Sequence, residues 1–146
     1  MEFEIVKMKQ EHLVEILKIE EELFPEPWTA EFFAYEIEQG DSLVAKELLT
    51  GEIIGYVCGW AVLDEYSITN VGVGKRYQKQ GIAKKMITHL MQKKLTEKVV
   101  VFYLEVRETN IPAINLYRNI GFQTIAKRLK YYRNPVEDAL VMKYQS

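Results

Sequence analysis

Residues 66–95 have the sequence YSITNVGVGKRYQKQGIAKKMITHLMQKKL, and this stretch decides the fold. Its first part is apolar and predicts a strand over Tyr66–Val73. Its last part has helical periodicity and predicts a helix over Gly81–Leu95. The apolar face of that helix is formed by Ile82, Met86, Leu90 and Met91. The stretch therefore predicts a strand, a glycine-containing loop and a helix in direct succession.

The loop before the helix is suited to bind an anion. The first turn of a helix has N–H groups without intrahelical partners and carries a partial positive charge. Gly81 lets the backbone approach a ligand closely, Ala83 keeps the first turn small, and Lys79 adds positive charge. The loop is not a Walker A loop, because Gly81 follows Gly74 by seven positions, and it lacks the third glycine of the dinucleotide fingerprint, where Tyr77 stands.

The remaining chain predicts a mixed α/β domain, with a central β-sheet and helices on both faces. The strand over Glu52–Leu63 is apolar at both odd and even positions, so we expect a sheet that is covered on both sides. One face of this strand is predicted to carry Ile54, Tyr56, Cys58, Trp60 and Val62. The other predicted elements are a strand over Met1–Met8, a helix from Leu13 to Phe24 ended by Pro25 and Pro27, a helix between Thr29 and Gly40, strands over Ser42–Leu49 and Val99–Val106, a helix over Ile111–Ile120, and closing strands over Phe122–Lys130 and Ala139–Tyr144 joined by a turn at Tyr131–Asp138.

Composition narrows the class of protein. The 146 residues fit one domain, residues 1–146. With 19 basic and 21 acidic residues the net charge is −2, which gives no global attraction to nucleic acid or to an anionic membrane. The single cysteine, Cys58, cannot form an internal disulfide. We find no signal peptide and no apolar stretch long enough to span a membrane, and therefore expect a cytoplasmic protein.

Two motifs resemble those of a known superfamily. Gln-x-x-Gly-x-Ala at residues 78–83, between strand and helix, resembles motif A of the GNAT N-acetyltransferases, whose loop holds the diphosphate of coenzyme A. Asn-x-x-Ala-x-x-Leu-Tyr-x-x-x-Gly-Phe at residues 110–122 resembles their motif B. The resemblance implies the GNAT fold and acetyl-coenzyme A as co-substrate.

Further segments are similar to the RimI family of that superfamily. They are Phe-Pro-Glu-Pro-Trp at 24–28, Leu-Glu-Val-Arg at 104–107, Tyr-Tyr at 131–132 and Glu-Asp-Ala at 137–139. The resemblance implies acetylation of the N-terminal alanine of the eighteenth small-subunit ribosomal protein. The chain departs from the family at Gly74-Lys75, where Asp-Pro is usual, and at Ala83, where glycine is usual. These departures concern the geometry of the loop, not the activity.

Two residues are the candidates for proton transfer. An α-amine has a pKa near 8, so at neutral pH it must lose a proton before it attacks a thioester. Glu105 ends a strand and is the candidate general base, although a strand carboxylate that merely faces solvent is the alternative, and Glu108 is a nearby rival. Tyr117 is the candidate acid for the leaving sulfur, with a packed core aromatic as the alternative. In both cases the resemblance favours the catalytic role.

Other residues are assigned to binding. The resemblance implies that the backbone of Val71, Gly72 and Val73 holds the acetyl and pantetheine groups, with a Val71 N–H polarising the thioester carbonyl. Asn110 is predicted both to cap a helix and to contact coenzyme A. The diphosphate loop consists of Gln78, Lys79, Gln80, Gly81, Ile82 and Ala83. The peptide-binding wall is assigned to Trp28, Tyr131 and Tyr132, which are predicted to lie in loops.

The remaining reactive side chains receive structural interpretations. Cys58 is predicted to be a buried thiol without catalytic function. His12 and His89 have no metal-ligand spacing and are expected on polar helix faces. A solvated helix face is predicted for Lys84, Lys85, Lys93 and Lys94. The lysines in the first turn of that helix are also candidates to contact the 3′-phosphate of the cofactor. Two other functions stay open at this point: acetylation of a small amine such as a polyamine or an aminoglycoside, and a non-catalytic acyl-coenzyme A-binding module.

Overall fold

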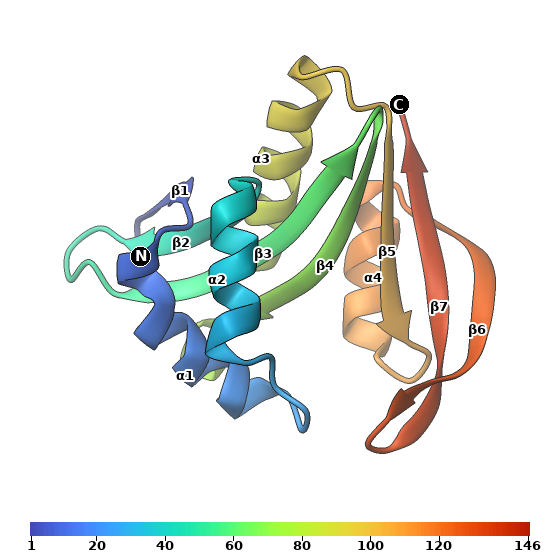
Figure 1. Cartoon of the computed structure of the whole chain (residues 1–146), viewed down its shortest axis with the longest axis horizontal. Helices are drawn as coiled ribbons and strands as arrows, with labels where there is room; N and C mark the ends of the chain where they lie inside the picture. The colour runs from blue at the N-terminus through green and yellow to red at the C-terminus, as the bar shows by residue number, and fades with distance from the viewer.

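A seven-stranded sheet runs through the computed structural model, which describes residues 1–146 (Figure 1). The strands are β1 (Phe3–Lys7), β2 (Leu43–Glu47), β3 (Ile53–Val62), β4 (Glu65–Val73), β5 (Val101–Arg107), β6 (Gln123–Arg133) and β7 (Val136–Gln145). The helices are α1 (Leu13–Leu23), α2 (Ala30–Gln39), α3 (Ile82–Thr96) and α4 (Ile111–Ile120), with short 3₁₀ turns at Gln10–His12 and Lys75–Tyr77. The predicted mixed α/β fold with helices on both faces is confirmed.

The order of the strands places an opening in the middle of the sheet. The order is β1-β2-β3-β4-β5-β7-β6, and β4 and β5 form the only parallel pair. This pair covers only Glu65–Ser67 against Val101–Tyr103, after which the two strands separate. A bulge lies in the separated part of β4: Ile68 pairs with Gly59 and Asn70 with Cys58, which leaves Thr69 without a partner. The free edge of β4 beyond Ser67 is therefore available to a ligand.

Two layers of helices cover the sheet, as Figure 1 shows. One apolar core lies under α1 and α2 and contains Ile16, Ile19, Phe33, Val44, Tyr56 and Cys58. The other lies under α3 and α4 and includes Ile82, Met86, Leu90, Phe102, Ile114 and Tyr117. No helix has the combination of length and apolar character that a membrane span requires.

The predicted helix boundaries follow from their caps. Thr29 accepts a hydrogen bond from the backbone N–H of Phe32 at 3.2 Å and begins α2, which ends at Gly40 with φ +78°. Asn110 accepts from the N–H of Ala113 at 3.3 Å and begins α4. The N-cap prediction for Asn110 is thus confirmed.

The predicted alternation along β3 is wrong at both ends of the strand. Ile54 packs in the core under α3, whereas Tyr56 and Cys58 pack under α1 and α2. The cause is a register shift between β2 and β3 next to Ile54, which moves the following side chains to the opposite face. At the other end Trp60 and Val62 are exposed, so the sheet is not covered there.

The closing hairpin is longer than predicted. Strand β6 continues to Arg133 and β7 begins at Val136, so Tyr131 and Tyr132 lie in a strand and not in a turn. The register shifts between Arg128 and Tyr132, where Lys130 has φ +52° and donates its backbone N–H to Asp138 Oδ1 at 2.8 Å. This irregularity interrupts the alternation of the sequence, and the continued strand was missed for that reason.

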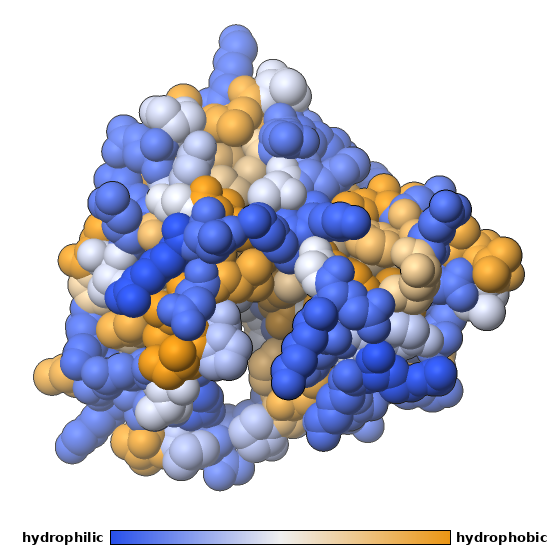
Figure 2. Space-filling model, turned by 180° about the vertical axis from the view of Figure 1, so that it is seen from behind, coloured by the Kyte–Doolittle hydropathy of each residue, from blue (hydrophilic) through white to orange (hydrophobic).

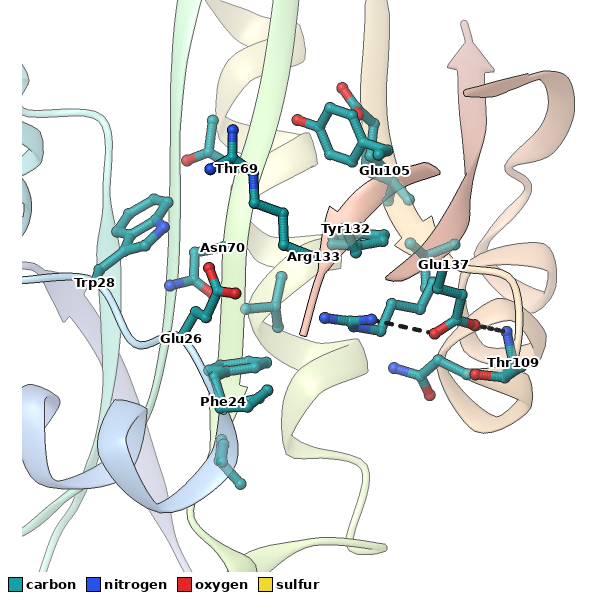
Figure 3. A pocket seen from close by; sticks show the side chains of 18 of the residues that line it. Phe24, Glu26, Trp28, Thr69, Asn70, Glu105, Thr109, Tyr132, Arg133 and Glu137 are labelled. Atoms are coloured by element: carbon teal, nitrogen blue, oxygen red, sulfur yellow. Dashed lines mark hydrogen bonds and ion pairs between the residues drawn. The ribbon is translucent and has the colours of Figure 1, made fainter. Parts of the chain in front are cut away.

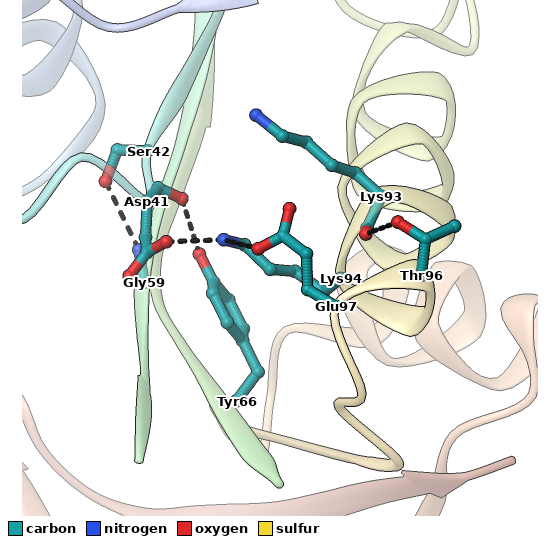
Figure 4. A network of polar contacts seen from close by, with 8 residues as sticks. All are labelled: Asp41, Ser42, Gly59, Tyr66, Lys93, Lys94, Thr96 and Glu97. Atoms are coloured by element: carbon teal, nitrogen blue, oxygen red, sulfur yellow. Dashed lines mark hydrogen bonds and ion pairs between the residues drawn. The ribbon is translucent and has the colours of Figure 1, made fainter. Parts of the chain in front are cut away.

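Two residues predicted on polar surfaces are buried. His12 is 6% exposed, its Nδ1 accepts the backbone N–H of Lys9 at 2.9 Å, and burial lowers its pKa. Lys94 is 5% exposed and forms ion pairs with Asp41 and Glu97, the latter at 3.0 Å (Figure 4). A lysine is buried at low cost only when carboxylates pair with it, and one of the two partners, Asp41, is distant in sequence.

Candidate active site

A cleft of about 860 Å³ opens where β4 and β5 separate. Its lining comes from the end of α1 and the segment between α1 and α2, from β4, β5 and α4, and from the β6–β7 hairpin. Figure 2, the view from behind, shows it as a hollow in the lower part of the molecule between two lobes. The structure brings seven of the predicted site residues to this cleft: Glu105, Tyr117, Val71, Asn110, Trp28, Tyr131 and Tyr132.

Glu105 lies in β5, directly opposite Val141 of β7, and its side chain is 28% exposed. Its Oε2 is 3.4 Å from Arg128 Nε, an ion pair, and accepts no hydrogen bond. The Oε2 atom itself is buried, but the side chain as a whole is partly exposed and lines the cleft, so the carboxylate can take a proton from a substrate or from a water there. The rival Glu108 does not line the cleft and forms an ion pair with Lys127 at 2.8 Å.

Tyr117 lies on the buried face of α4, with its ring edge-on to Phe122 at 6.1 Å between centroids. It is 8% exposed and still contributes to the lining of the cleft. Burial raises the pKa of Tyr117 to about 12, because the charged phenolate is poorly solvated there. The phenol is therefore protonated at neutral pH and can donate its proton.

Aromatic side chains form two walls of the cleft (Figure 3). Trp28 packs on Phe32 and Phe33 from α2, with ring centroids 4.4 and 5.2 Å away. On the opposite wall Tyr131 and Tyr132 stand edge to face at 5.1 Å. Burial raises the pKa of Tyr132 to about 12, and the nearby carboxylate of Glu105 acts in the same direction.

Of the three residues predicted to hold the acetyl and pantetheine groups, Val71 lines the cleft. Gly72 faces away from it: a Cβ added there would lie 2.4 Å from Cζ of Tyr56, so packing against that ring requires glycine. Val73 is buried in the core. Any contact of Gly72 and Val73 with a ligand is therefore made by the backbone, as the sequence analysis predicts.

The predicted diphosphate loop follows β4 and lies outside the lining of the cleft. Lys79 and Gly81 have φ of +64° and +81°, which curves the backbone around the start of α3. A Cβ added at Gly81 would meet no protein atom within 4 Å, so the space beside it is open. The first turn of α3 has no acidic residue and contains Lys84 and Lys85, an arrangement that favours an anion at the helix N-terminus.

Gln78 has a role within the loop itself. Its side-chain amide donates to the carbonyl of Val73 at 3.0 Å, which ties the loop back to β4. Lys84 Nζ lies 2.5 Å from Asn119 Oδ1 and links α3 to α4. Both side chains therefore stabilise the shape of the loop region.

Several polar residues of the cleft have no role predicted from the sequence. Arg107 and Glu137 belong to this group, although they occur in the Leu-Glu-Val-Arg and Glu-Asp-Ala motifs. Glu20 was passed over although it is one turn after Ile16 and one turn before Leu23 on the apolar face of α1. A carboxylate in the middle of an apolar stripe is the signal that could have identified Glu20.

The other reactive side chains lie outside the cleft. Cys58 is fully buried, as predicted, and burial raises the pKa of its thiol. The chain has no group of three or more His, Cys, Asp and Glu side chains that could hold a metal ion. Glu105 and Tyr117 both line the cleft, and their roles in proton transfer stay a prediction.

Comparison with protein families agrees with this geometry. Residues 13–122 match the model of the Acetyltransferase (GNAT) family, and this match covers β4, β5 and the loop before α3. The chain belongs to the GNAT acetyltransferase family. It is therefore an acetyltransferase, and its separated β4 and β5 form the cleft of a GNAT fold.

Curated relatives of this GNAT chain span nearly its whole length. The ribosomal protein bS18-alanine N-acetyltransferase of Escherichia coli (strain K12) is 32% identical over 127 residues, which are 85% of this chain and 84% of the relative. N-alpha-acetyltransferase RimI of Mycobacterium tuberculosis (strain H37Rv) is 31% identical over 135 residues, 88% and 84% of the two chains.

Solved structures show the same fold. The crystal structure of the ribosomal-protein-S18-alanine N-acetyltransferase from Escherichia coli superposes with a TM-score of 0.90 at 28% identity, over 99% of this chain and 94% of the other. Arabidopsis thaliana NAA60 in complex with a bisubstrate analogue superposes with a TM-score of 0.89 at 25% identity, over 99% and 98%.

Proposed function

We propose that this protein is an N-alpha-acetyltransferase that transfers acetyl from acetyl-coenzyme A to the N-terminal alanine of ribosomal protein bS18. The observation that carries the proposal is the convergence of Glu105 and Tyr117 on one cleft beside the free edge of β4. The names of the relatives from Escherichia coli and Mycobacterium tuberculosis support the substrate. The crystal structure from Escherichia coli supports it at the level of the fold.

The co-substrate is proposed to bind along β4 toward α3. The open space beside Gly81 and the N-terminus of α3 would receive the diphosphate, with Lys79 at the rim. The remaining loop positions, Gln80, Ile82 and Ala83, would contribute backbone N–H groups. The pantetheine and acetyl groups would follow the unpaired edge of β4 over Val71, Gly72 and Val73, and Asn110 would contact the cofactor at the start of α4.

The chemical step needs one base and one acid. Glu105 would take a proton from the ammonium group, directly or through a water, and the free amine would attack the thioester carbonyl. A backbone N–H at Val71 would stabilise the oxyanion of the tetrahedral intermediate. As the C–S bond breaks, Tyr117 would give its proton to the sulfur, and the second proton of the attacking nitrogen would pass to the resulting phenolate, which leaves a neutral amide and regenerates Tyr117. The amide and coenzyme A then leave.

The cleft also suggests how the protein substrate enters. Trp28 on one wall and Tyr131 and Tyr132 on the other would hold a small first side chain and an extended peptide behind it. A free N-terminus of a ribosomal protein fits this opening, and such a partner would place the enzyme in the cytoplasm. Neither nucleic acid nor a membrane is part of the proposal.

The test is a product analysis with a panel of amines. The enzyme is incubated with acetyl-coenzyme A and either a peptide with the N-terminal sequence of bS18, a polyamine or an aminoglycoside, and the products are weighed by mass spectrometry. Acetylation of the peptide alone supports the proposal. Acetylation of the small amines without the peptide would replace it with the alternative activity, and no transfer to any amine would point to a binding module.

A further inference from the structure

The carboxylate of Glu20 is a point where three segments of the chain meet. It lies near the end of α1, is 2% exposed, and accepts three hydrogen bonds. Its Oε1 accepts from the Tyr56 hydroxyl at 2.5 Å and from Asn70 Nδ2 at 2.8 Å. Its Oε2 accepts from the backbone N–H of Trp28 at 3.0 Å. The three donors come from three different parts of the chain: Tyr56 from β3, Asn70 from β4 and Trp28 from the segment before α2.

These donors belong to the two sides of the proposed reaction. Trp28 forms the peptide wall, and its ring reaches Phe33, whose ring stands edge-on to Tyr56 at 5.7 Å. Asn70 precedes Val71 in β4, and the Tyr56 ring lies directly against the backbone of Gly72. Glu20 therefore connects the wall for the amine with the strand for the acetyl group.

We propose that Glu20 is a positioning residue, which holds the Trp28 wall in register with β4 so that the bound amine meets the thioester. The inference rests on the proposed acetyl transfer to a peptide amine. Glu20 contacts neither substrate in this account and acts only through Trp28, Asn70 and Tyr56. Effective catalysis depends on such alignment, since a displacement of about 1 Å can lower a rate by roughly 10²-fold.

The chemistry of the site requires a carboxylate at Glu20. Three donors converge on two oxygens, whereas the amide of a glutamine offers one oxygen and one NH₂ group. If the amide oxygen faces Tyr56 and Asn70, its NH₂ group meets the N–H of Trp28. If it faces Trp28, the NH₂ group meets the amide of Asn70. The first orientation sets a donor against a donor, and the second avoids this only if Asn70 turns its amide and Tyr56 its hydroxyl to accept, so Glu20→Gln disturbs at least one connection with almost no change in volume.

Glu15 provides a matched control on the same helix. Its Oε2 accepts one backbone N–H, that of Ile53, at 2.9 Å, and its side chain does not line the cleft. Glu15→Gln therefore makes the same chemical change in α1 without touching the peptide wall or the separated part of β4. Any general effect of weakening α1 should appear in both variants.

The experiment compares Glu20→Gln and Glu15→Gln in a Trp60→Phe background, in which Trp28 is the only tryptophan. We expect Glu20→Gln to lower kcat/KM for the alanine peptide by roughly 10–100-fold, with KM raised, and to leave the Kd of acetyl-coenzyme A within about twofold. The fluorescence of Trp28 should shift to longer wavelength in Glu20→Gln and not in Glu15→Gln.

A folded Glu20→Gln variant with the kinetics and the fluorescence of Glu15→Gln would overturn the inference. If Glu20→Gln does not fold, Asn70→Ala and Tyr56→Phe each remove one donor, and unchanged peptide kinetics in both would equally overturn it. The fluorescence measurement needs no turnover. A wild-type enzyme that acetylates no peptide would thus refute the proposed function, while the Trp28 shift would still report on the connection made by Glu20.

Discussion

The guanidinium of Arg107 lies 4.4 Å from the centre of the Tyr132 ring, so the end of β5 stacks on a wall of the cleft. The same guanidinium donates to the carbonyls of Pro135 and Asn134, at 2.9 and 3.2 Å, and to Glu137 at 3.2 Å. Its planar fork thereby fixes the tip of the β6–β7 hairpin over the cleft.

Arg107→Lys should therefore weaken peptide binding. A lysine keeps the charge but cannot reach two carbonyls, a carboxylate and a ring face together. We expect KM for the peptide to rise by about 5–20-fold, roughly 1–2 kcal/mol, with little change in the Kd of acetyl-coenzyme A. Steady-state kinetics and calorimetry measure the two quantities. The exposed Arg118 on α4 supplies the control variant Arg118→Lys, and an equal KM in both variants would contradict this role of Arg107.

The diphosphate loop is tested by Gly81→Ala. The residue has φ +81°, and the added methyl group would enter the open space proposed for the diphosphate. We expect the affinity for acetyl-coenzyme A to fall at least tenfold, about 1.4 kcal/mol, as measured by calorimetry. Gly51→Ala, at φ +73° in the turn between β2 and β3, carries comparable backbone strain away from the loop. Affinity that is unchanged in Gly81→Ala, or lost equally in Gly51→Ala, would refute the assignment.

Glu105→Gln and Tyr117→Phe should separate catalysis from binding. Both substitutions preserve shape, so the Kd of acetyl-coenzyme A should barely change. Loss of the general base should lower kcat by about 10²–10⁴-fold. Single-turnover measurements with saturating peptide follow the chemical step, and Glu108→Gln is the control because Glu108 lies outside the cleft. Wild-type rates in both variants would show that other residues transfer the protons.

The pH dependence follows from the pKa of Tyr117. Because burial raises this pKa to about 12, the phenol stays protonated until well above pH 10. We expect kcat/KM to rise as the substrate amine deprotonates near pH 8 and then to stay level to about pH 10. Any stability that this protonated tyrosine contributes is present below pH 10 and is lost only as pH rises toward 12. A decline between pH 8 and pH 10 that disappears in Tyr117→Phe would contradict the raised pKa.

Local sequence signals are sufficient to predict the helices and strands around the proposed acetyl-coenzyme A site. Glycines, caps and helical periodicity are short-range features, and they gave the strand before Gly81, the helix after it and the cap at Asn110 within a residue or two. The resemblance added Glu105 and Tyr117, which periodicity alone could not distinguish from a surface carboxylate and a core aromatic. The structure places both residues at one cleft.

The missed features depend on contacts between distant segments. The sequence predicts Lys94 in water because its partner Asp41, 53 positions earlier, is brought near only by the fold. It predicts Tyr131 and Tyr132 in a turn because the bulge in β6 interrupts the alternation. It indicates no role for Glu20 because the three partners of this carboxylate come from three other segments. In each case the interaction that determines the position of the side chain cannot be read from the periodicity of the neighbouring residues.

The most direct test of the central claim is the site of acetylation on a peptide that offers two amines. The peptide begins with alanine and contains one internal lysine, and a second copy has its α-amine capped. We predict, by tandem mass spectrometry, a single acetyl group on the alanine nitrogen of the free peptide and none on the capped one. An acetyl group on the lysine side chain, with the alanine amine left free, would contradict the account.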